Sequence, residues 1–206
     1  MRLNYLLKKI NKSIIIGTDE TNVFSLAGPL VAGAYITKKR IKGVKDSKKL
    51  TRKKIKELAE KLKNNGLYYI DFVTPEEFDQ LGMKMASIEA KRRAVLNLIE
   101  KYKLPKTKIL LITDGLIPIS CGLSELAIPH ADEKIYEVSA ASIIAKAYLN
   151  DKMEEYDRLY PGYNFKNNTG SPGKSHYEAI LRLGFSPIHR KKFCLSFPQL
   201  KNLKIM

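Results

Sequence analysis

The chain has 206 residues, 44% of them hydrophobic, and a formal net charge of +16 at pH 7. This composition excludes a disordered chain, and two cysteines exclude a disulfide framework. The excess of Lys and Arg predicts a polyanionic partner, with nucleic acid ahead of a membrane surface, although lysine-rich proteins also occur for solubility or thermal stability. The first 13 residues match neither a signal peptide nor a membrane span, so we expect a cytoplasmic protein without membrane contact.

The first predicted element is a buried strand that begins at Ile14. Three β-branched residues favour a strand, and Gly17 is expected to end the apolar run. Asp19 and Glu20 follow where the strand should leave the core. Two adjacent carboxylates there are costly unless a lysine, an arginine or a divalent metal ion compensates them. A polar turn after a strand is the commoner origin of an Asp-Glu pair.

The chain then alternates between strand and helix patterns, which predicts an α/β fold. The run at 108–115 is apolar until Asp114, as expected for a strand in the middle of such a sheet. If this strand lies next to the first one, Asp114 approaches Asp19 and Glu20. Further strands are predicted at 30–36 and 67–73, and helices at 51–63, 74–102 (interrupted near Gly82), 138–160 and 174–183.

The remaining segments have weaker patterns. Residues 116–137 are irregular, 167–173 form an evident loop, and 186–193 are expected to be extended and basic. The small residues at 138–146 predict a helix that packs tightly on the sheet. No change in composition demands a domain boundary, so we expect a single domain over 1–206. Its core would cover about 14–160 and its C-terminal extension about 161–206.

Four acidic residues lie at the ends of predicted elements. Carboxylate oxygens suit hard cations such as Mg²⁺ or Mn²⁺. Two such ions, roughly 3.5–4 Å apart, can activate a water and stabilise the leaving oxygen in phosphodiester hydrolysis. A basic surface with such a pocket is what a nuclease needs, although sequence spacing does not establish that the acids converge. They are Asp19, Glu20, Asp114 and Asp132.

The chain also carries a series of short motifs between residue 14 and about residue 197. They are Gly17-Thr18-Asp19-Glu20, Leu26-Ala27-Gly28-Pro29, Asp46-Ser47-Lys48-Lys49-Leu50, Asp114-Gly115, His130–Lys134, Ser139–Lys146, and Ser186–Arg190 with Phe193. Each motif is weak alone, whereas the ordered set is highly specific. The set resembles that of the ribonuclease HII family, the type 2 ribonucleases H.

The resemblance implies a ribonuclease H-like α/β fold. A mixed five-stranded sheet would be flanked by helices, and a C-terminal helical extension would contribute to substrate binding. The implied activity is endonucleolytic hydrolysis of the RNA strand of RNA–DNA hybrids to 5′-phosphate and 3′-hydroxyl ends. The implied cofactor is Mg²⁺ or Mn²⁺, with two ions when substrate is bound.

The resemblance also assigns the metal-binding catalytic acids. The family's fourth acid precedes the block at 139–146, which favours Asp132 over Asp151. Asn150 stands where members often carry an Asp after that block, so we expect Asp151 to be a helix-surface acid, with a one-residue displacement as the alternative. Carried over by position, the catalytic and metal-binding residues are Asp19, Glu20, Asp114 and Asp132.

The substrate-reading positions depart from the family pattern. The family has Gly-Arg-Gly where this chain has residues 22–24, and its sugar-packing Tyr falls at Ser171. Glycines let the backbone approach a ribose 2′-hydroxyl, and Arg can contact a phosphate. We therefore expect longer RNA tracts to be preferred over a single ribonucleotide in DNA. The substrate-binding positions carried over are Asn22, Val23, Phe24, Ser47, Lys48, Ser171, His189 and Arg190.

Two alternative functions remain open at this level. A non-catalytic hybrid-binding paralogue would explain the altered reading positions, whereas the four retained acids favour an enzyme. The ribonuclease HIII type carries an extra N-terminal domain, for which we expect no room before Ile14. The expected partner is an RNA–DNA hybrid duplex, with no obligate protein partner, and the expected state is a monomer.

Overall fold

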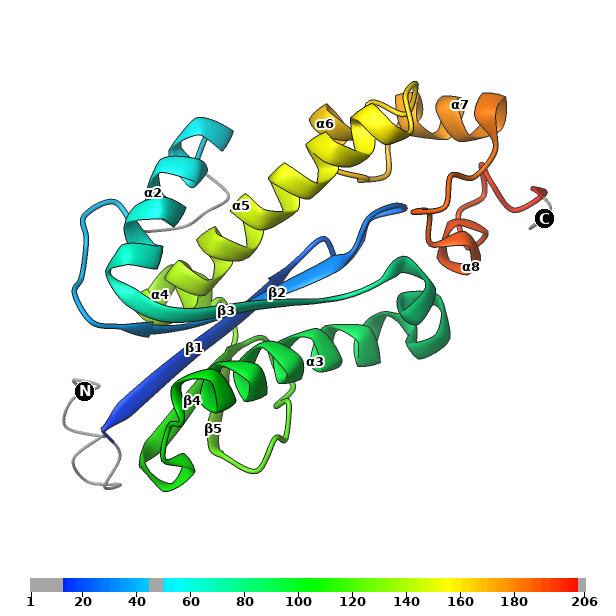
Figure 1. The fold of residues 1–206 in the computed structure, drawn as a ribbon. Coiled ribbons are helices and arrows are strands. Elements are labelled where there is room, and N and C mark those ends of the chain that lie inside the picture. The colour runs from blue at the N-terminus through cyan, green and yellow to red at the C-terminus, as the bar shows by residue number, and fades with distance from the viewer. Residues whose placement is uncertain (1–12, 45–49, 204–206) are drawn as a thin grey trace.

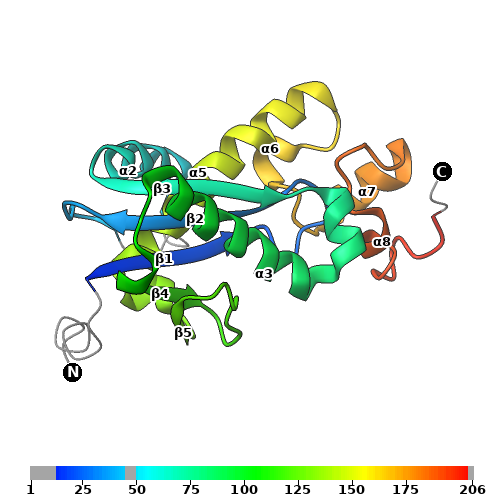
Figure 2. The ribbon, with the colours of Figure 1, turned by 60° about the horizontal axis from the view of Figure 1, so that its bottom comes forward.

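The computed structural model describes residues 13–44 and 50–203, which are built around a five-stranded sheet (Figures 1 and 2). The strand order is β3-β2-β1-β4-β5. Antiparallel pairing joins β1 to β2 and β2 to β3, and parallel pairing joins β1 to β4 and β4 to β5. This confirms the predicted mixed sheet. The strands are β1 (Ile14–Thr21), β2 (Leu30–Thr37), β3 (Gly66–Val73), β4 (Ile109–Asp114) and β5 (Ser124–Ile128).

Long helices cover both faces of the sheet (Figure 1). Ala32 and Ala34 of β2 pack in one core with α3 (Pro75–Tyr102), while Val31 and Tyr35 face the side of α5 (Tyr136–Leu159). Alternate strand residues face opposite sides, so the two helices lie on opposite faces. The other helices are α2 (Arg52–Asn64), η2 (Lys106–Lys108), α4 (Ala131–Lys134), α6 (Phe165–Asn168), α7 (Lys174–Leu183) and α8 (Lys191–Cys194).

Local signals place the long helices close to their predicted bounds. Thr51 caps α2 by accepting a hydrogen bond from Lys54 N at 3.3 Å. Thr74 and Glu77 form a capping box at the start of α3, and Gly82 interrupts that helix with a φ of 73°. Among the described residues, no helix has both the length and the apolar character needed to span a bilayer.

Four elements differ from the sequence predictions, and one of them is the four-residue helix α4, which lies in the stretch expected to be irregular. β5 lies in the stretch expected to be irregular, because this edge strand has exposed and half-buried residues rather than an apolar run. The helix α6 begins the segment predicted to be a loop, and α8 ends the segment predicted to be extended. These helices have four residues each, which is too short for a helical pattern to show in the sequence.

Gly17 ends the apolar run of the first strand, as predicted, and lies within that strand. The strand continues to Thr21, and Gly17 pairs with Tyr35 on one side and Ile112 on the other. A Cβ at Gly17 would overlap the backbone of Glu137 in α5. The glycine therefore permits a close approach between the helix and the sheet, as the small residues of α5 predicted.

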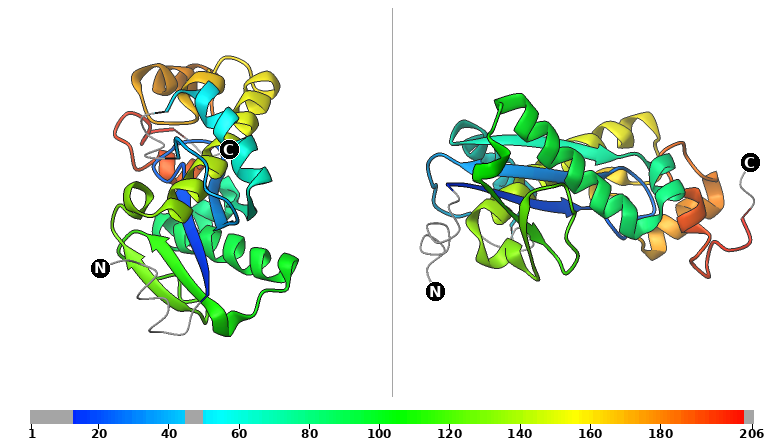
Figure 3. Two further views of the ribbon diagram at one scale, coloured as in Figure 1. Left: turned by 90° about the vertical axis from the view of Figure 1, so that its left-hand side faces the viewer. Right: turned by 90° about the horizontal axis from the view of Figure 1, so that it is seen from below.

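The C-terminal helices gather at the end of the sheet where β1 finishes (Figure 3). Leu26 N donates to Gly170 O at 2.8 Å, and Gly28 N donates to Ile188 O at 2.9 Å. A bridge between Ala27 and His189 adds a third connection. The loop between β1 and β2 is thus held by residues after 160, while the division into core and extension stays a prediction.

The first testable prediction concerns the contact at Gly17. Gly17→Ala should lower the free energy of unfolding by about 2 to 3 kcal/mol, because α5 must move away from β1. Gly173→Ala is the control, since its Cβ would meet nothing within 4 Å and its φ of 175° is ordinary extended backbone. The control should stay within about 0.5 kcal/mol in urea denaturation. Equal stability of the two variants would contradict this account.

Candidate active site

The four predicted acids lie at one edge of the sheet. Asp19 and Glu20 are in the last part of β1, Asp114 is the last residue of β4, and Asp132 is in α4. Because β1 and β4 are parallel neighbours, their carboxyl ends lie side by side. The expectation that these acids stand on neighbouring strands is confirmed.

Asp19 is the most deeply buried of the strand acids, with 6% of its surface exposed. Burial raises the pKa of Asp19 to about 7, and the charge of Glu20 is the next largest cause. Asp114 and Asp132 also raise this pKa, while a hydrogen bond from Ser142 lowers it. All four acids therefore share one region of negative potential, which a cation would stabilise.

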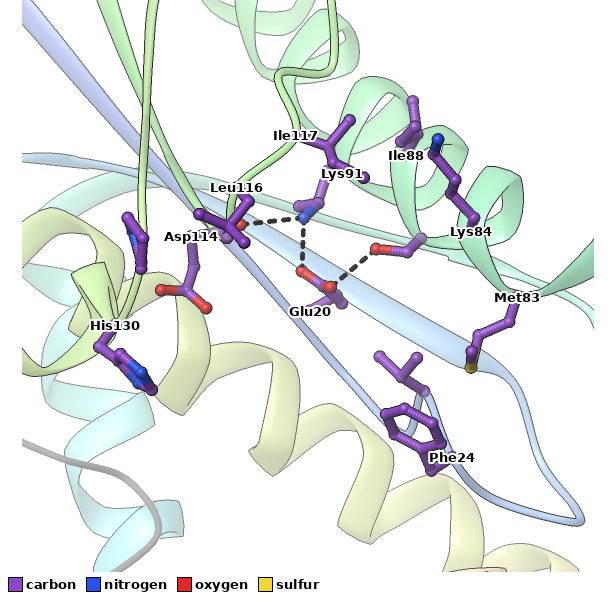
Figure 4. Close-up of a pocket in the computed structure, with 14 residues that line it drawn as sticks. Glu20, Phe24, Met83, Lys84, Ile88, Lys91, Asp114, Leu116, Ile117 and His130 are labelled. Atoms are coloured by element: carbon purple, nitrogen blue, oxygen red, sulfur yellow. Dashed lines mark hydrogen bonds and ion pairs between the residues drawn. The ribbon is translucent and has the colours of Figure 1, made fainter.

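Glu20 is held by two side chains of α3 (Figure 4). Ser87 Oγ donates to Glu20 Oε1 at 2.7 Å, and Lys91 Nζ lies 2.9 Å from Oε2. Lys91 also donates to the backbone oxygen of Asp114 at 3.2 Å. Of the three cations that could compensate Asp19 and Glu20, the described residues supply a lysine. The sequence did not identify Lys91 as the pairing residue, because it lies far from Glu20 in the chain and within a helix rich in Lys and Arg.

The other acids are also oriented by the protein. Asp114 Oδ1 accepts a hydrogen bond from Ala131 N at 2.6 Å, which ties the end of β4 to the start of α4. Asp132, in the same short helix, is 3% exposed. Its backbone oxygen accepts from Ser139 Oγ at 2.5 Å. The first turn of α5 therefore fixes the position of the fourth acid.

The chemistry of this donor set suits a hard divalent cation, because all four side chains offer carboxylate oxygens. Within residues 13–44 and 50–203, however, no group of three acidic, His or Cys side chains stands close enough to hold an ion. The reason is visible in the contacts, since Glu20 turns toward Ser87 and Lys91 while Asp114 turns toward Ala131. The site therefore has suitable carboxylate ligands, two of which are held by contacts with the helices: Glu20 by α3 and Asp114 by α4.

A cavity of about 510 Å³ opens beside the acids (Figure 4). Glu20, Asp114 and His130 line its polar part. Its rim is apolar and includes the exposed side chains of Phe24 and Leu116. Two lysines, Lys84 and Lys91, also line the cavity, and charged groups of both signs beside an aromatic rim suit a nucleotide, whose phosphate and base need different surroundings.

Val23 and Phe24 line one side of this cavity, and Asn22 directly precedes them in the chain. Asn22 has a φ of 71°, the left-handed conformation that glycine adopts most easily. Its side chain donates to Ala27 O at 3.1 Å and Pro29 O at 2.9 Å. Val23 is half-buried, whereas Phe24 is 66% exposed. The loop therefore keeps a glycine-like backbone and presents one aromatic ring to the cavity.

Arg190 does not reach the surface, which contradicts the prediction that its side chain contacts nucleic acid. The residue is 0% exposed and its guanidinium stacks 4.0 Å from the ring centre of Phe78. It donates to Asn22 O at 2.7 Å, Val23 O at 2.8 Å and Gly28 O at 3.1 Å. Arg190 thus fixes the loop between β1 and β2, because its planar guanidinium binds three carbonyl oxygens of that loop.

His189 is also buried, and the prediction of a nucleic-acid contact fails for the same reason. Its Nδ1 accepts from Ser186 N at 2.9 Å, and its Nε2 lies 3.1 Å from His176 Nε2. Burial lowers the pKa of His189 to about 3, so the ring is neutral at pH 7. Ser171 is exposed in its loop, while its backbone oxygen receives His176 Nδ1–H at 2.9 Å. Ser47 and Lys48 lie outside the described residues.

Known proteins resemble this chain in sequence and in fold. The sequence model described as Ribonuclease HII matches residues 16–196. Ribonuclease HII of Thermus thermophilus is 39% identical over 193 residues, covering 90% of this chain and 92% of the relative. Ribonuclease H2 of Pyrococcus horikoshii superposes with a TM-score of 0.73 and 28% identity, covering 92% and 96%. Bst-RNase HIII, solved in complex with Mn²⁺, shares the fold with a TM-score of 0.64 and 19% identity, covering 95% and 70%.

A second prediction follows from the charge on Asp19. Without divalent ions at pH 8, Asp19→Asn should unfold with a free energy about 2 to 4 kcal/mol higher, because the amide removes a buried charge beside other acids. The gain should shrink as the pH falls below about 7, where Asp19 of the folded protein becomes protonated, and vanish below about 4, where Asp19 of the unfolded chain is protonated as well.

Asp151→Asn provides the matched control for this measurement. Its carboxylate is 65% exposed and lies 3.8 Å from Lys56 Nζ, so the same substitution should change stability by less than about 0.5 kcal/mol. Urea denaturation in the presence of a chelator at several pH values measures both variants. A destabilised Asp19→Asn protein at pH 8 would refute the idea that the acids repel one another.

Proposed function

Because the chain belongs to the ribonuclease HII family, we propose that Asp19, Glu20, Asp114 and Asp132 form the active site of this endonuclease. The enzyme hydrolyses the RNA strand of RNA–DNA hybrids, and the proposed products carry 5′-phosphate and 3′-hydroxyl ends. The observation that carries the site is the parallel pairing of β1 and β4, which places Asp19 and Glu20 beside Asp114, whose carboxylate accepts a hydrogen bond from the start of the helix that holds Asp132. Family membership also disfavours an inactive hybrid-binding paralogue.

The family depends on divalent metal ions, and we assign them here to the four carboxylates. The proposed ions are Mg²⁺ or Mn²⁺, two of them when substrate is bound. Hard oxygen ligands support this choice, as does the Mn²⁺ complex of Bst-RNase HIII, which has the same fold. When bound, such ions activate a water and stabilise the departing 3′-oxygen.

The protein's own part in this chemistry is to hold its ligands in place. Asp19 stands on a central strand whose neighbours on both sides restrict its backbone. Asp114 is oriented by Ala131 N, and Glu20 by Ser87 and Lys91. These partners fix the two carboxylates in the metal-free protein, and Glu20 and Asp114 would have to turn toward Asp19 to share a cation with it.

Substrate would be held by charge and by shape. The helix α2 carries several lysines and an arginine on exposed turns, which can contact the phosphate backbone without reading sequence. The cavity beside the acids, with Phe24 on its rim, would take the sugar and base next to the cut. Ser171 and the Asn22-Val23 backbone remain candidate contacts. The monomeric state and the cytoplasmic location stay predictions.

The third prediction distinguishes the two candidates for the fourth acid. Asp132→Asn should lower the rate of hybrid cleavage by at least about 100-fold, since it removes a proposed metal ligand next to Asp19. Asp151→Asn should keep the rate within about twofold, because its side chain is exposed on α5 beside Lys56. Initial rates on an RNA–DNA hybrid in Mg²⁺ and in Mn²⁺ measure both. The reverse pattern would place the fourth ligand at Asp151.

The fourth prediction concerns the substrate itself. A continuous RNA tract should be cleaved at least about tenfold faster than DNA with one embedded ribonucleotide, a difference of about 1.4 kcal/mol. The reason is that Val23 offers no phosphate contact and Phe24 replaces a residue without a side chain. Gel assays with end-labelled duplexes of equal length measure the ratio. Efficient incision 5′ to a lone ribonucleotide would show that residues 22–24 read the junction after all.

A further inference from the structure

Lys91 of α3 reaches into the acid cluster beside the cavity. Lys91 is 4% exposed, and its ammonium lies 2.9 Å from Glu20 Oε2 and 3.2 Å from the backbone oxygen of Asp114 (Figure 4). These contacts touch both strands that carry the acids. A charged group so deeply buried is costly unless it is paired, so this contact is a built feature of the site rather than a surface ion pair.

The helix that carries this lysine packs closely against the sheet. Three alanines, at positions 86, 90 and 94, are fully buried and allow α3 to lie close to the sheet. Ser87 and Lys91 are one turn apart and therefore point to the same place, where they hold the two oxygens of Glu20. Glu20 cannot turn toward Asp19 and Asp114 while both contacts persist.

An ammonium group and a divalent ion would compete for the same carboxylate. Lys91 compensates Glu20 in the metal-free protein, and a metal ion bound to that carboxylate would be repelled by the adjacent positive charge. We propose that Lys91 is an internal counter-cation that competes with divalent ions for Glu20 and so sets the metal affinity of the site. This inference rests on the proposed function, because it requires the four acids to be the metal site.

Lys84 offers a matched comparison within the same helix and cavity. It lines the same pocket two turns earlier in α3, but it is exposed and no contact joins it to Glu20 or Asp114 (Figure 4). Removing its charge changes the net charge of the protein as much as removing that of Lys91. Any difference between the two variants therefore reports the contact with Glu20.

The test compares the wild type, Lys91→Met and Lys84→Met by calorimetric titration with MnCl₂. Methionine keeps the length of the buried chain and removes its charge. We expect Lys91→Met to bind Mn²⁺ about 5- to 100-fold more tightly than the wild type, and Lys84→Met to bind within about twofold of it. Melting curves give a second readout. Without metal Lys91→Met should melt below the wild type, and Mn²⁺ should raise its melting temperature by more.

The other outcomes each have a definite meaning. Unchanged or weaker Mn²⁺ binding by Lys91→Met, with normal binding by the wild type, overturns the role of Lys91 alone. No Mn²⁺ binding by any of the three proteins overturns the proposed metal site as well. If Lys91→Met does not fold with or without Mn²⁺, ¹H–¹⁵N spectra of the wild-type lysine ammonium groups decide. Mg²⁺ should shift the Lys91 signal, and an unmoved signal overturns the inference.

Discussion

Negative charge collected at the carboxyl ends of two parallel strands is the constraint on which the rest of this structure depends. The strands β1 and β4 must be adjacent to bring Asp19 and Asp114 together, and burial there makes ionisation of Asp19 unfavourable. Lys91 of α3 pairs with Glu20, and the backbone amide of Ala131 in α4 donates a hydrogen bond to Asp114. The two layers that flank the sheet therefore meet at the site.

The loop between β1 and β2 is also held by a buried charged side chain. Arg190 lies beneath it, wholly buried, and holds three of its carbonyl oxygens. The C-terminal region thus holds the loop that lies beside the cavity. A change at Arg190 would move the Asn22-Val23 backbone at the edge of the cavity, even though the arginine touches no solvent.

Chemistry and recognition have separate structural supports in this chain. The acids are fixed by strands and by α3, while the reading loop is fixed by Arg190 and by the side chain of Asn22. Asn22 keeps the left-handed backbone that a glycine would adopt, because its short amide bonds within the loop. The loop therefore keeps a chain path that glycine adopts easily, while Phe24 places an exposed ring beside the cavity.

The sequence by itself determined four of the five strands, the four longest helices and the family, because these depend on local patterns and on ordered motifs. It could not show β5, whose residues are too exposed to form an apolar run, nor the burial of His189 and Arg190. It also left the compensating cation undecided among lysine, arginine and metal. Only the tertiary structure selected Lys91, because that contact joins segments far apart in the chain, where no local periodicity or propensity records which side chains meet.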